Sequence, residues 1–134
     1  MSDEMIITFP GGKRVDASYA GFEFKTDQPA DHGGDGSAPS PFQWFLASLG
    51  TCAGYYTLAF CAQRGIPADG IRVVQRIEPR PEGGVGRIAV EIQLPPSFPE
   101  KYVKAIAHAA AACAVKKAIE SPPAFEVTAV VVAP

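Results

Sequence analysis

Cysteine is scarce in this sequence of 134 residues, which contains only Cys52, Cys61 and Cys113. So small and odd a number argues against the disulfide framework of a secreted domain. The first five residues, Met-Ser-Asp-Glu-Met, carry acidic charge and lack the basic start and apolar middle of a signal peptide. We therefore expect a cytoplasmic protein, in which a thiol is either an inert core group or a reactive one.

Neither sign of charge dominates, because the formal net charge is −2 and no basic or acidic run is present. This balance argues against binding to nucleic acid or to an anionic membrane surface. No segment is expected to reach the roughly 18 apolar residues of a membrane span. The histidines and cysteines lack the spacing of a zinc site, so no metal is expected, and Gly33–Gly36 lacks the P-loop pattern.

The pattern of elements indicates an α+β fold in a single domain covering 1–134. Hydrophobic residues make up 47% of the chain, which is enough for a sizeable core. Alternating residues predict strands and apolar runs between breakers predict helices. The expected order begins with strands within 5–26, a loop over 27–41 and a helix from 39 or 41 to 64. Strands at 71–78 and 86–94, a helix from 97 or 99 to 119, and a strand at 125–132 then follow.

The first helix is apolar around most of its circumference, which is typical of a buried helix. One domain of this size rarely buries such a helix alone, so we expect a partner chain to cover it. Gly50 and Gly54 each cost about 1 kcal/mol inside a helix. Close approach of another backbone or a ligand would explain them. Between them lies Cys52, and the helical step of about 100° places Tyr55 and Tyr56 on its side.

A single cysteine is most often a small buried hydrophobic residue, and this is the interpretation favoured for Cys61. It also suits Cys113, which lies in a run of alanines in the second predicted helix. Small side chains let two helices approach closely. If this helix packs against the first one, Cys113 could reach Cys52 within the Cα separation of about 4.4–6.8 Å that a disulfide requires.

Several motifs together resemble the OsmC/Ohr family, the osmotically inducible and organic hydroperoxide resistance proteins. They are the glycine-rich loop, Ala38-Pro-Ser-Pro41, Leu46-Ala-Ser-Leu-Gly-Thr-Cys52, and a second helix with Cys113-Ala-Val-Lys-Lys117. The resemblance covers essentially the whole chain. It implies antiparallel sheets around two long central helices, in a homodimer of intertwined chains.

The resemblance also implies a chemistry, a thiol-dependent peroxidase that reduces organic hydroperoxides. The cysteine matching Cys52 attacks the peroxide as a thiolate and becomes a sulfenic acid, and the one matching Cys113 resolves it to a disulfide. An external dithiol, of lipoyl or another type, then reduces this disulfide, and no bound cofactor is implied.

The chain departs from the family pattern around the proposed thiolate. Where the hydroperoxide-reducing branches carry a glutamate, this chain has Phe42, and a less characterised branch's glutamate is replaced by Gln43. The arginine that follows two glycines becomes Lys13 and then Arg14. We expect Arg14, Lys13 and Gln43 to activate or position the thiolate. The second motif has Ala114 in place of proline.

A binding protein without catalysis is the alternative function on the same fold. Phe42, Tyr55 and Tyr56, with Trp44, would then surround a small apolar or thiol-bearing molecule. In either case the expected substrate pocket is lined by Phe42, Tyr55 and Tyr56.

Overall fold

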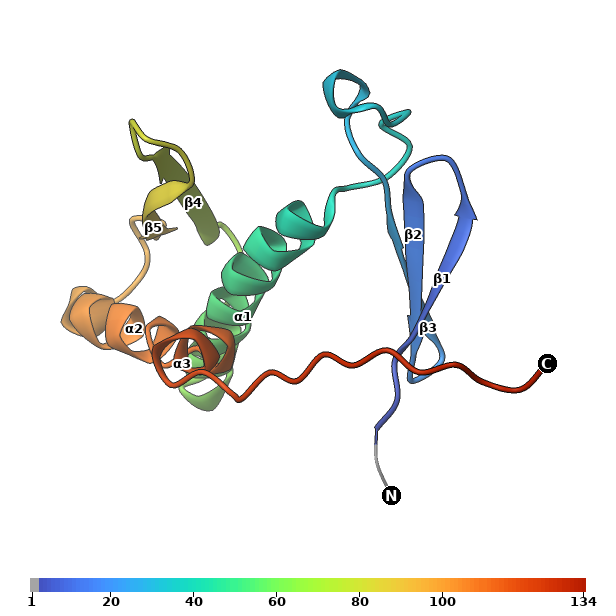
Figure 1. Ribbon diagram of the computed structural model, residues 1–134. Helices are drawn as coiled ribbons and strands as arrows, with labels where there is room; N and C mark the ends of the chain where they lie inside the picture. Colours follow the sequence, from blue (N-terminus) through green and yellow to red (C-terminus); the bar gives the residue numbers. More distant parts are fainter. Residues whose placement is uncertain (1–2) are drawn as a thin grey trace. The chain divides into compact units, whose positions relative to one another are not determined.

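A computed structural model describes residues 3–134, so Met1 and Ser2 of the acidic N-terminus lie outside the described residues. The chain divides into two compact units, 1–48 and 49–134. The elements follow the order of strands, helix, two strands and helices that the sequence predicts (Figure 1). The fold is of the α+β class, with a three-stranded and a two-stranded antiparallel sheet.

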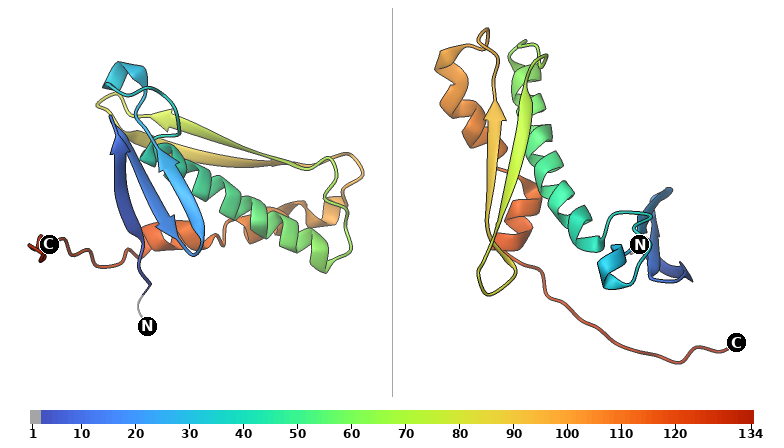
Figure 2. Two further views of the ribbon diagram at one scale, coloured as in Figure 1. Left: turned by 90° about the vertical axis from the view of Figure 1, so that its right-hand side faces the viewer. Right: turned by 90° about the horizontal axis from the view of Figure 1, so that it is seen from above.

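The N-terminal unit is built on a three-stranded sheet of β1 (Ile6–Gly11), β2 (Arg14–Tyr19) and β3 (Phe22–Thr26). Neighbouring strands are antiparallel in the order β1-β2-β3, and Figure 2 shows them as a meander. The turn between β2 and β3 lies at Ala20 and Gly21, which both have positive φ. Pro10 and Gly11 still belong to β1, so the first turn follows them.

The loop after β3 is organised by one buried carboxylate, Asp27, which is 1% exposed. Its Oδ2 accepts hydrogen bonds from the Ser37 hydroxyl at 2.6 Å and the Ser37 backbone N–H at 3.0 Å, and its Oδ1 accepts one from the N–H of Gln28. Gly34 packs so closely on the Gln28 carbonyl and on Asp27 that a Cβ would collide with both. The loop, which includes a short 3-10 helix at Ala30–His32, is therefore an ordered structure.

The long predicted helix is confirmed as α1 (Pro41–Gln63). It begins with a capping box, in which the Ser40 N–H donates to Gln43 Oε1 at 2.9 Å and the Gln43 N–H donates to Ser40 Oγ at 3.3 Å. By length and composition α1 could cross a membrane, so the expectation that no segment approaches a span is wrong by this criterion. Core helices of globular proteins meet the same criterion, because they too are apolar all round.

The C-terminal unit pairs β4 (Arg72–Pro79) with β5 (Val85–Gln93) in an antiparallel hairpin that runs alongside α1 and α2 (Figure 2). Ion pairs Arg87–Glu78 and Arg76–Glu91 lie on one face, with half-exposed side chains. The predicted alternation of wet and apolar faces is thus confirmed. The core cluster of this unit contains Phe60, Cys61, Phe98 and Ile106.

The second predicted helix is not continuous, which corrects the sequence-based expectation. After a 3-10 turn at Glu100–Tyr102 the chain forms α2 (Val103–Ala110) and then α3 (Ala114–Glu120). Cys113 lies in the break with φ −56° and ψ 128°, an extended rather than helical backbone. Alanine-rich sequence contains no breaker here, so packing rather than propensity interrupts the helix.

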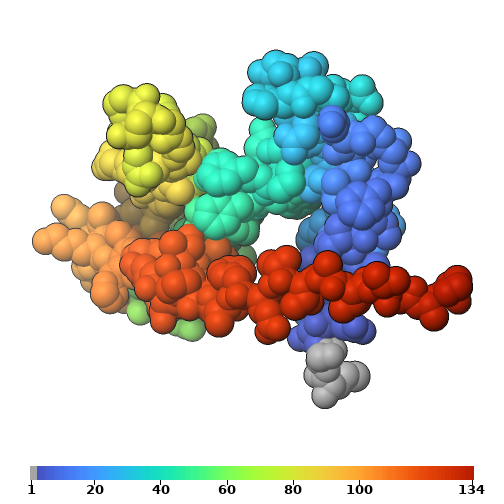
Figure 3. Space-filling view, in the orientation of Figure 1, coloured from blue at the N-terminus to red at the C-terminus, as the bar shows by residue number. Residues whose placement is uncertain are grey.

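The prediction of a strand at 125–132 is also wrong within the residues that the structure describes. Residues 121–134 contain no assigned strand, and Figure 3 shows them (red) as a single extended run of side chains. A strand requires a neighbour for its backbone hydrogen bonds, and no strand within residues 3–134 pairs with this segment. Its apolar side chains are exposed, with Phe125 85% and Val127 95% accessible.

Asp27 predicts a defined pH dependence of stability. Hydrogen bonds from Ser37, with smaller ones from Gln28 and Asp35, lower its pKa from 3.8 to about 2. A carboxyl group with a lowered pKa stabilises the fold above its unfolded pKa, and this contribution is lost as the pH falls from about 4 toward 2. We expect urea unfolding to show Asp27→Asn less stable than wild type at pH 7, with the difference shrinking at pH 3.

The matched control is Asp31→Asn in the same loop, where the side chain is exposed and contacts only His32 among the hydrogen bonds and ion pairs of the described residues. This variant should unfold like wild type at both pH values. An Asp27→Asn deficit that stayed the same at pH 3 would contradict the role of the ionised carboxylate.

Candidate active site

Two free thiols meet at the centre of the candidate site. Cys52 lies in the middle of α1 and is partly buried, while Cys113 lies in the break before α3 and is 3% exposed. The Cys113 thiol donates a hydrogen bond toward the Cys52 sulfur. The structure therefore brings together the two catalytic cysteines expected from the sequence, each contributed by a different element.

The environment of Cys52 favours its thiolate. A hydrogen bond from the backbone N–H of Val115, a second from the Cys113 thiol and a third from the N–H of Ala114 lower the pKa of Cys52 below its ordinary value of 9.0. Partial burial acts in the opposite direction but is outweighed. A thiolate is the nucleophilic form of cysteine, so Cys52 is the more reactive of the pair.

The break in the second helix makes these hydrogen bonds available. The first N–H groups of any helix have no partner inside it. Because the Cys113 backbone is extended, the Cys113 thiol and the N–H groups of Ala114 and Val115 are all directed at the Cys52 sulfur. Sequence reasoning missed this arrangement, because a continuous alanine-rich helix would keep these two N–H groups within its own hydrogen bonds.

The two glycines beside Cys52 differ in their surroundings. At Gly50 an added Cβ would lie 3.3 Å from the side-chain oxygen of Gln75 on β4, so the close neighbour is a side chain rather than the expected backbone or ligand. At Gly54 nothing lies within 4 Å of such a Cβ. Only Gly50 is thus explained by packing in the described chain.

Cys61 and Arg64 are part of the structure around the core rather than of this site. Cys61 is 1% exposed and packs in the cluster with Phe60 and Ile106, as the sequence predicts. Arg64 stacks over the Phe60 ring at 3.6 Å and donates to the Phe60 carbonyl at 3.2 Å. Arg64 lies about three helical turns beyond Cys52, too far to be its activating cation.

Three predicted activating residues belong to the N-terminal unit and have local roles there. Gln43 caps α1 through its side-chain oxygen. The Arg14 guanidinium donates to the Gly11 carbonyl at 3.3 Å, and the Lys13 side chain lies beside Gly33. Their effect on the Cys52 thiolate stays a prediction.

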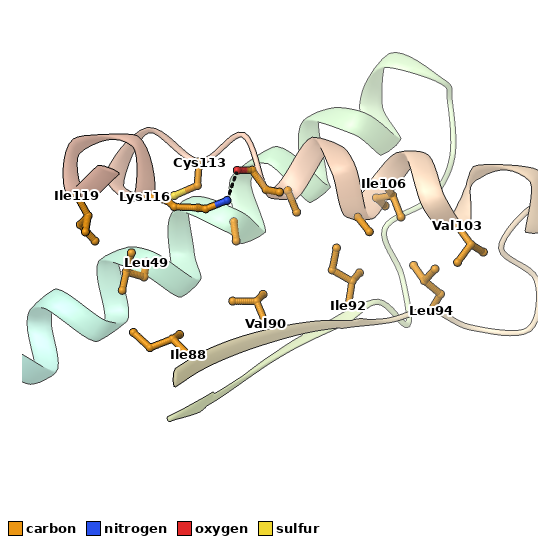
Figure 4. A pocket seen from close by; sticks show the side chains of 14 residues that line it. Leu49, Ile88, Val90, Ile92, Leu94, Val103, Ile106, Cys113, Lys116 and Ile119 are labelled. Carbon is orange, nitrogen blue, oxygen red and sulfur yellow. Dashed lines mark hydrogen bonds between the residues drawn. The ribbon is translucent and has the colours of Figure 1, made fainter. Parts of the chain in front are cut away.

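The predicted substrate-pocket residues do not line the cavity of the C-terminal unit. Phe42 and Tyr55 are 51% and 64% exposed, and Tyr55 packs edge-on against Tyr56. The cavity, about 430 Å³, lies instead between β5 and the helices (Figure 4). Whether Phe42, Tyr55 and Tyr56 contact a substrate stays a prediction, while the cavity itself is a feature that sequence reasoning missed.

Lys116 is the charged side chain among the residues that line this cavity. Sequence reasoning missed this residue as well. It lies beside Cys113 in Figure 4, with its ammonium 3.4 Å from the Ala111 carbonyl and 4.0 Å from Glu120. One turn of helix separates it from Cys113, a spacing that would have indicated the contact if the break had been foreseen. Over residues 3–134 no group of three or more acidic, histidine or cysteine side chains is arranged to hold a metal ion.

Comparison with known proteins gives the context for this pair of thiols. The family model of the OsmC-like proteins matches residues 34–128. No curated protein matches. A protein of Psychrobacter arcticus, provisionally described as an osmotic stress induced and detoxification response protein, is 24% identical with a TM-score of 0.70, and the match covers 88% of each chain.

Two further solved structures have the same fold at lower identity. An OsmC-like protein of unknown function from Vibrio cholerae is 12% identical with a TM-score of 0.63, covering 90% of this chain and 94% of that one. The organic hydroperoxide resistance protein OsmC of Legionella pneumophila is 20% identical with a TM-score of 0.54, covering 87% and 88%. The family match and the shared fold agree, and the chain belongs to the OsmC-like protein family.

Proposed function

We propose that this protein is a thiol-dependent peroxidase that reduces organic hydroperoxides in the cytoplasm. The observation that carries the proposal is the contact between the Cys113 thiol and the Cys52 sulfur. A peroxidase of this type needs a nucleophilic thiolate and a second thiol within bonding reach of it. Membership of a redox-related family, with a structural neighbour named as a hydroperoxide resistance protein, supports the same chemistry.

In the first step the Cys52 thiolate attacks the terminal oxygen of the hydroperoxide. An S–O bond forms and the O–O bond breaks, so the sulfur is oxidised by two electrons to the sulfenic acid. The alkoxide leaves and takes up a proton to become the alcohol. The N–H groups of Val115 and Ala114 support this step, because they stabilise the attacking anion.

In the second step the Cys113 sulfur attacks the sulfenic sulfur of Cys52. A disulfide forms, the S–O bond breaks, and the hydroxyl group leaves as water with the proton of the Cys113 thiol. An external dithiol then returns both cysteines to the reduced state. Arg14, Lys13 and Gln43 remain proposed activating or positioning residues, and Phe42, Tyr55 and Tyr56 remain proposed pocket residues, all from the family resemblance.

Mass spectrometry after treatment with one equivalent of cumene hydroperoxide tests the function. We expect the reduced protein to lose two hydrogens, mapped to a bond between Cys52 and Cys113. Cys52→Ser should lose hydroperoxide consumption completely, because it lacks the attacking sulfur. Cys113→Ser should still react once and stop at the sulfenic acid, which dimedone would label on Cys52.

The control for this experiment is Cys61→Ala, which removes the third thiol without touching the proposed pair. It should form the same disulfide at the rate of wild type. Free thiols that persist after minutes of exposure would contradict the peroxidase. The binding-protein alternative, which the apolar cavity of about 430 Å³ favours, would then become the better interpretation.

The lowered pKa of Cys52 predicts how fast it is alkylated at each pH. Only the thiolate reacts with iodoacetamide, so the rate at Cys52 should reach half its maximum below pH 9.0. Cys113→Ala removes one hydrogen-bond donor to the thiolate and should move this midpoint upward. Peptide mapping over a pH series measures it. An identical midpoint in wild type and Cys113→Ala would show that the Cys113 thiol does not stabilise the thiolate.

We also propose that the protein is a homodimer, as the family resemblance implies. Large apolar side chains of α1 are exposed in the single chain, including Phe42, Tyr55 and Leu58. Light scattering after size exclusion should give about twice the chain mass of 14.1 kDa. Tyr55→Lys and Leu58→Lys should shift the mass toward one chain, whereas Ser18→Lys, on the sheet of the N-terminal unit, should not. A wild-type mass of 14.1 kDa at micromolar concentration would exclude the dimer.

A further inference from the structure

The cavity of the C-terminal unit is a preformed apolar site. Its volume of about 430 Å³ falls within the range of small-molecule sites. Side chains from β5 point across it toward the helices, as Figure 4 shows. Its walls are aliphatic: Ile88, Val90 and Ile92 on β5, Leu94 just after it, Ile106 on α2 and Ile119 on α3.

Of the two thiols, only Cys113 is in the wall of this cavity. Leu49 and Ala53 of α1 line it as well, but Cys52, between them in the sequence, does not. The two sulfurs are therefore approached from different directions. A molecule held in the cavity therefore contacts Cys113 and not Cys52.

One end of the cavity carries a positive charge, since Lys116 lines it next to Cys113 (Figure 4). Its ammonium has a long contact of 3.4 Å to the Ala111 carbonyl and one of 4.0 Å to Glu120, and its side chain is 48% exposed. A cation beside a sulfur attracts an incoming thiolate. The cavity thus combines an apolar chamber with a site for an anionic sulfur at the cysteine.

We propose that this cavity binds the apolar arm of a dithiol reductant, and that the dithiol attacks Cys113 rather than Cys52. The inference rests on the proposed function, because it concerns the disulfide formed there. It adds where the reductant binds, what chemistry it presents, and which sulfur it meets first.

The reaction is a pair of thiol–disulfide exchanges. A thiolate of the reductant bonds to Cys113 Sγ, the Cys52–Cys113 bond breaks, and Cys52 leaves as a thiolate. The second thiol of the reductant, once deprotonated, attacks the reductant sulfur of this mixed disulfide. Cys113 is released and takes up a proton from the reductant. The protein gains two electrons, and the reductant loses two and becomes a cyclic disulfide.

The hydrogen bonds around Cys52 favour the same direction of attack. A sulfur whose thiolate is stabilised is the better leaving group in thiol–disulfide exchange. Cys52 receives hydrogen bonds from the N–H groups of Val115 and Ala114. Attack at Cys113 therefore expels Cys52 as an anion that these donors stabilise.

Trapping the mixed disulfide tests which sulfur is attacked. The protein is first oxidised with diamide, so that the test does not depend on its reaction with hydroperoxides. It is then treated with 1-hexanethiol, which cannot complete the second exchange, and quenched with iodoacetamide. After trypsin, we expect the hexyl disulfide on the peptide 105–116, which contains Cys113, and the alkyl label on Cys52. Hexyl groups on Cys52, or equally on both cysteines, would overturn the proposal.

Filling the cavity tests where the reductant binds. Ala107 lines the cavity from α2, while Ala105 on the same helix is exposed outside it. Reduction of the diamide-oxidised protein by dihydrolipoamide should slow about tenfold in Ala107→Phe, because the apolar arm loses its burial. Reduction by the small dithiothreitol should change much less, and Ala105→Phe should behave as wild type with both.

The two proposals can fail separately. Equal slowing by Ala107→Phe with both dithiols, or no slowing with either, would exclude the cavity as the reductant site. The peroxidase would still stand if cumene hydroperoxide forms the Cys52–Cys113 disulfide. Conversely, the protein could fail to react with cumene hydroperoxide while its diamide-formed disulfide is reduced through Cys113. That result would exclude the proposed function and support the reductant site.

Discussion

The interruption of the second helix at Cys113 is the constraint on which the candidate site depends. With ψ at 128° this residue is extended at the end of the break over 111–113, and α3 starts directly after it. This break turns the Cys113 thiol and two backbone N–H groups toward the Cys52 sulfur on α1. A continuous helix would hold these N–H groups within its own hydrogen bonds, and Cys52 would lack both its thiolate stabilisation and its partner thiol.

Neutral donors, rather than a neighbouring charge, lower the pKa of Cys52 in the C-terminal unit. Gln43, one of the residues expected to position the thiolate, accepts a hydrogen bond at the start of α1. Hydrogen bonds from the backbone are fixed in direction by the fold and need no counter-ion. The same donors favour Cys52 as the leaving sulfur of a disulfide, because they stabilise its anion.

Predictions that rested on local pattern were the most accurate. The breakers Gly65 and Pro67 end a long apolar run, and α1 stops at Gln63 as expected. The alternation in β4 and β5 separates a charged face from an apolar one, because side chains alternate strictly along a strand. Residues 125–132 are rich in the β-branched residues typical of a strand, yet no strand forms in the described chain, because pairing depends on a neighbour that local sequence cannot supply.

The sequence by itself determined the α+β class, the order of most elements, the core position of Cys61 and the pair Cys52 and Cys113. The first three follow from composition and periodicity, which depend on residues close in the chain, and the cysteine pair follows from the family resemblance of the motifs. Only the tertiary structure decided the break at Cys113, the donors on Cys52, and the apolar cavity with Lys116 at one end. Each of these depends on packing between α1, β5 and α3, where contacts between distant residues outweigh the helix propensity of an alanine-rich segment.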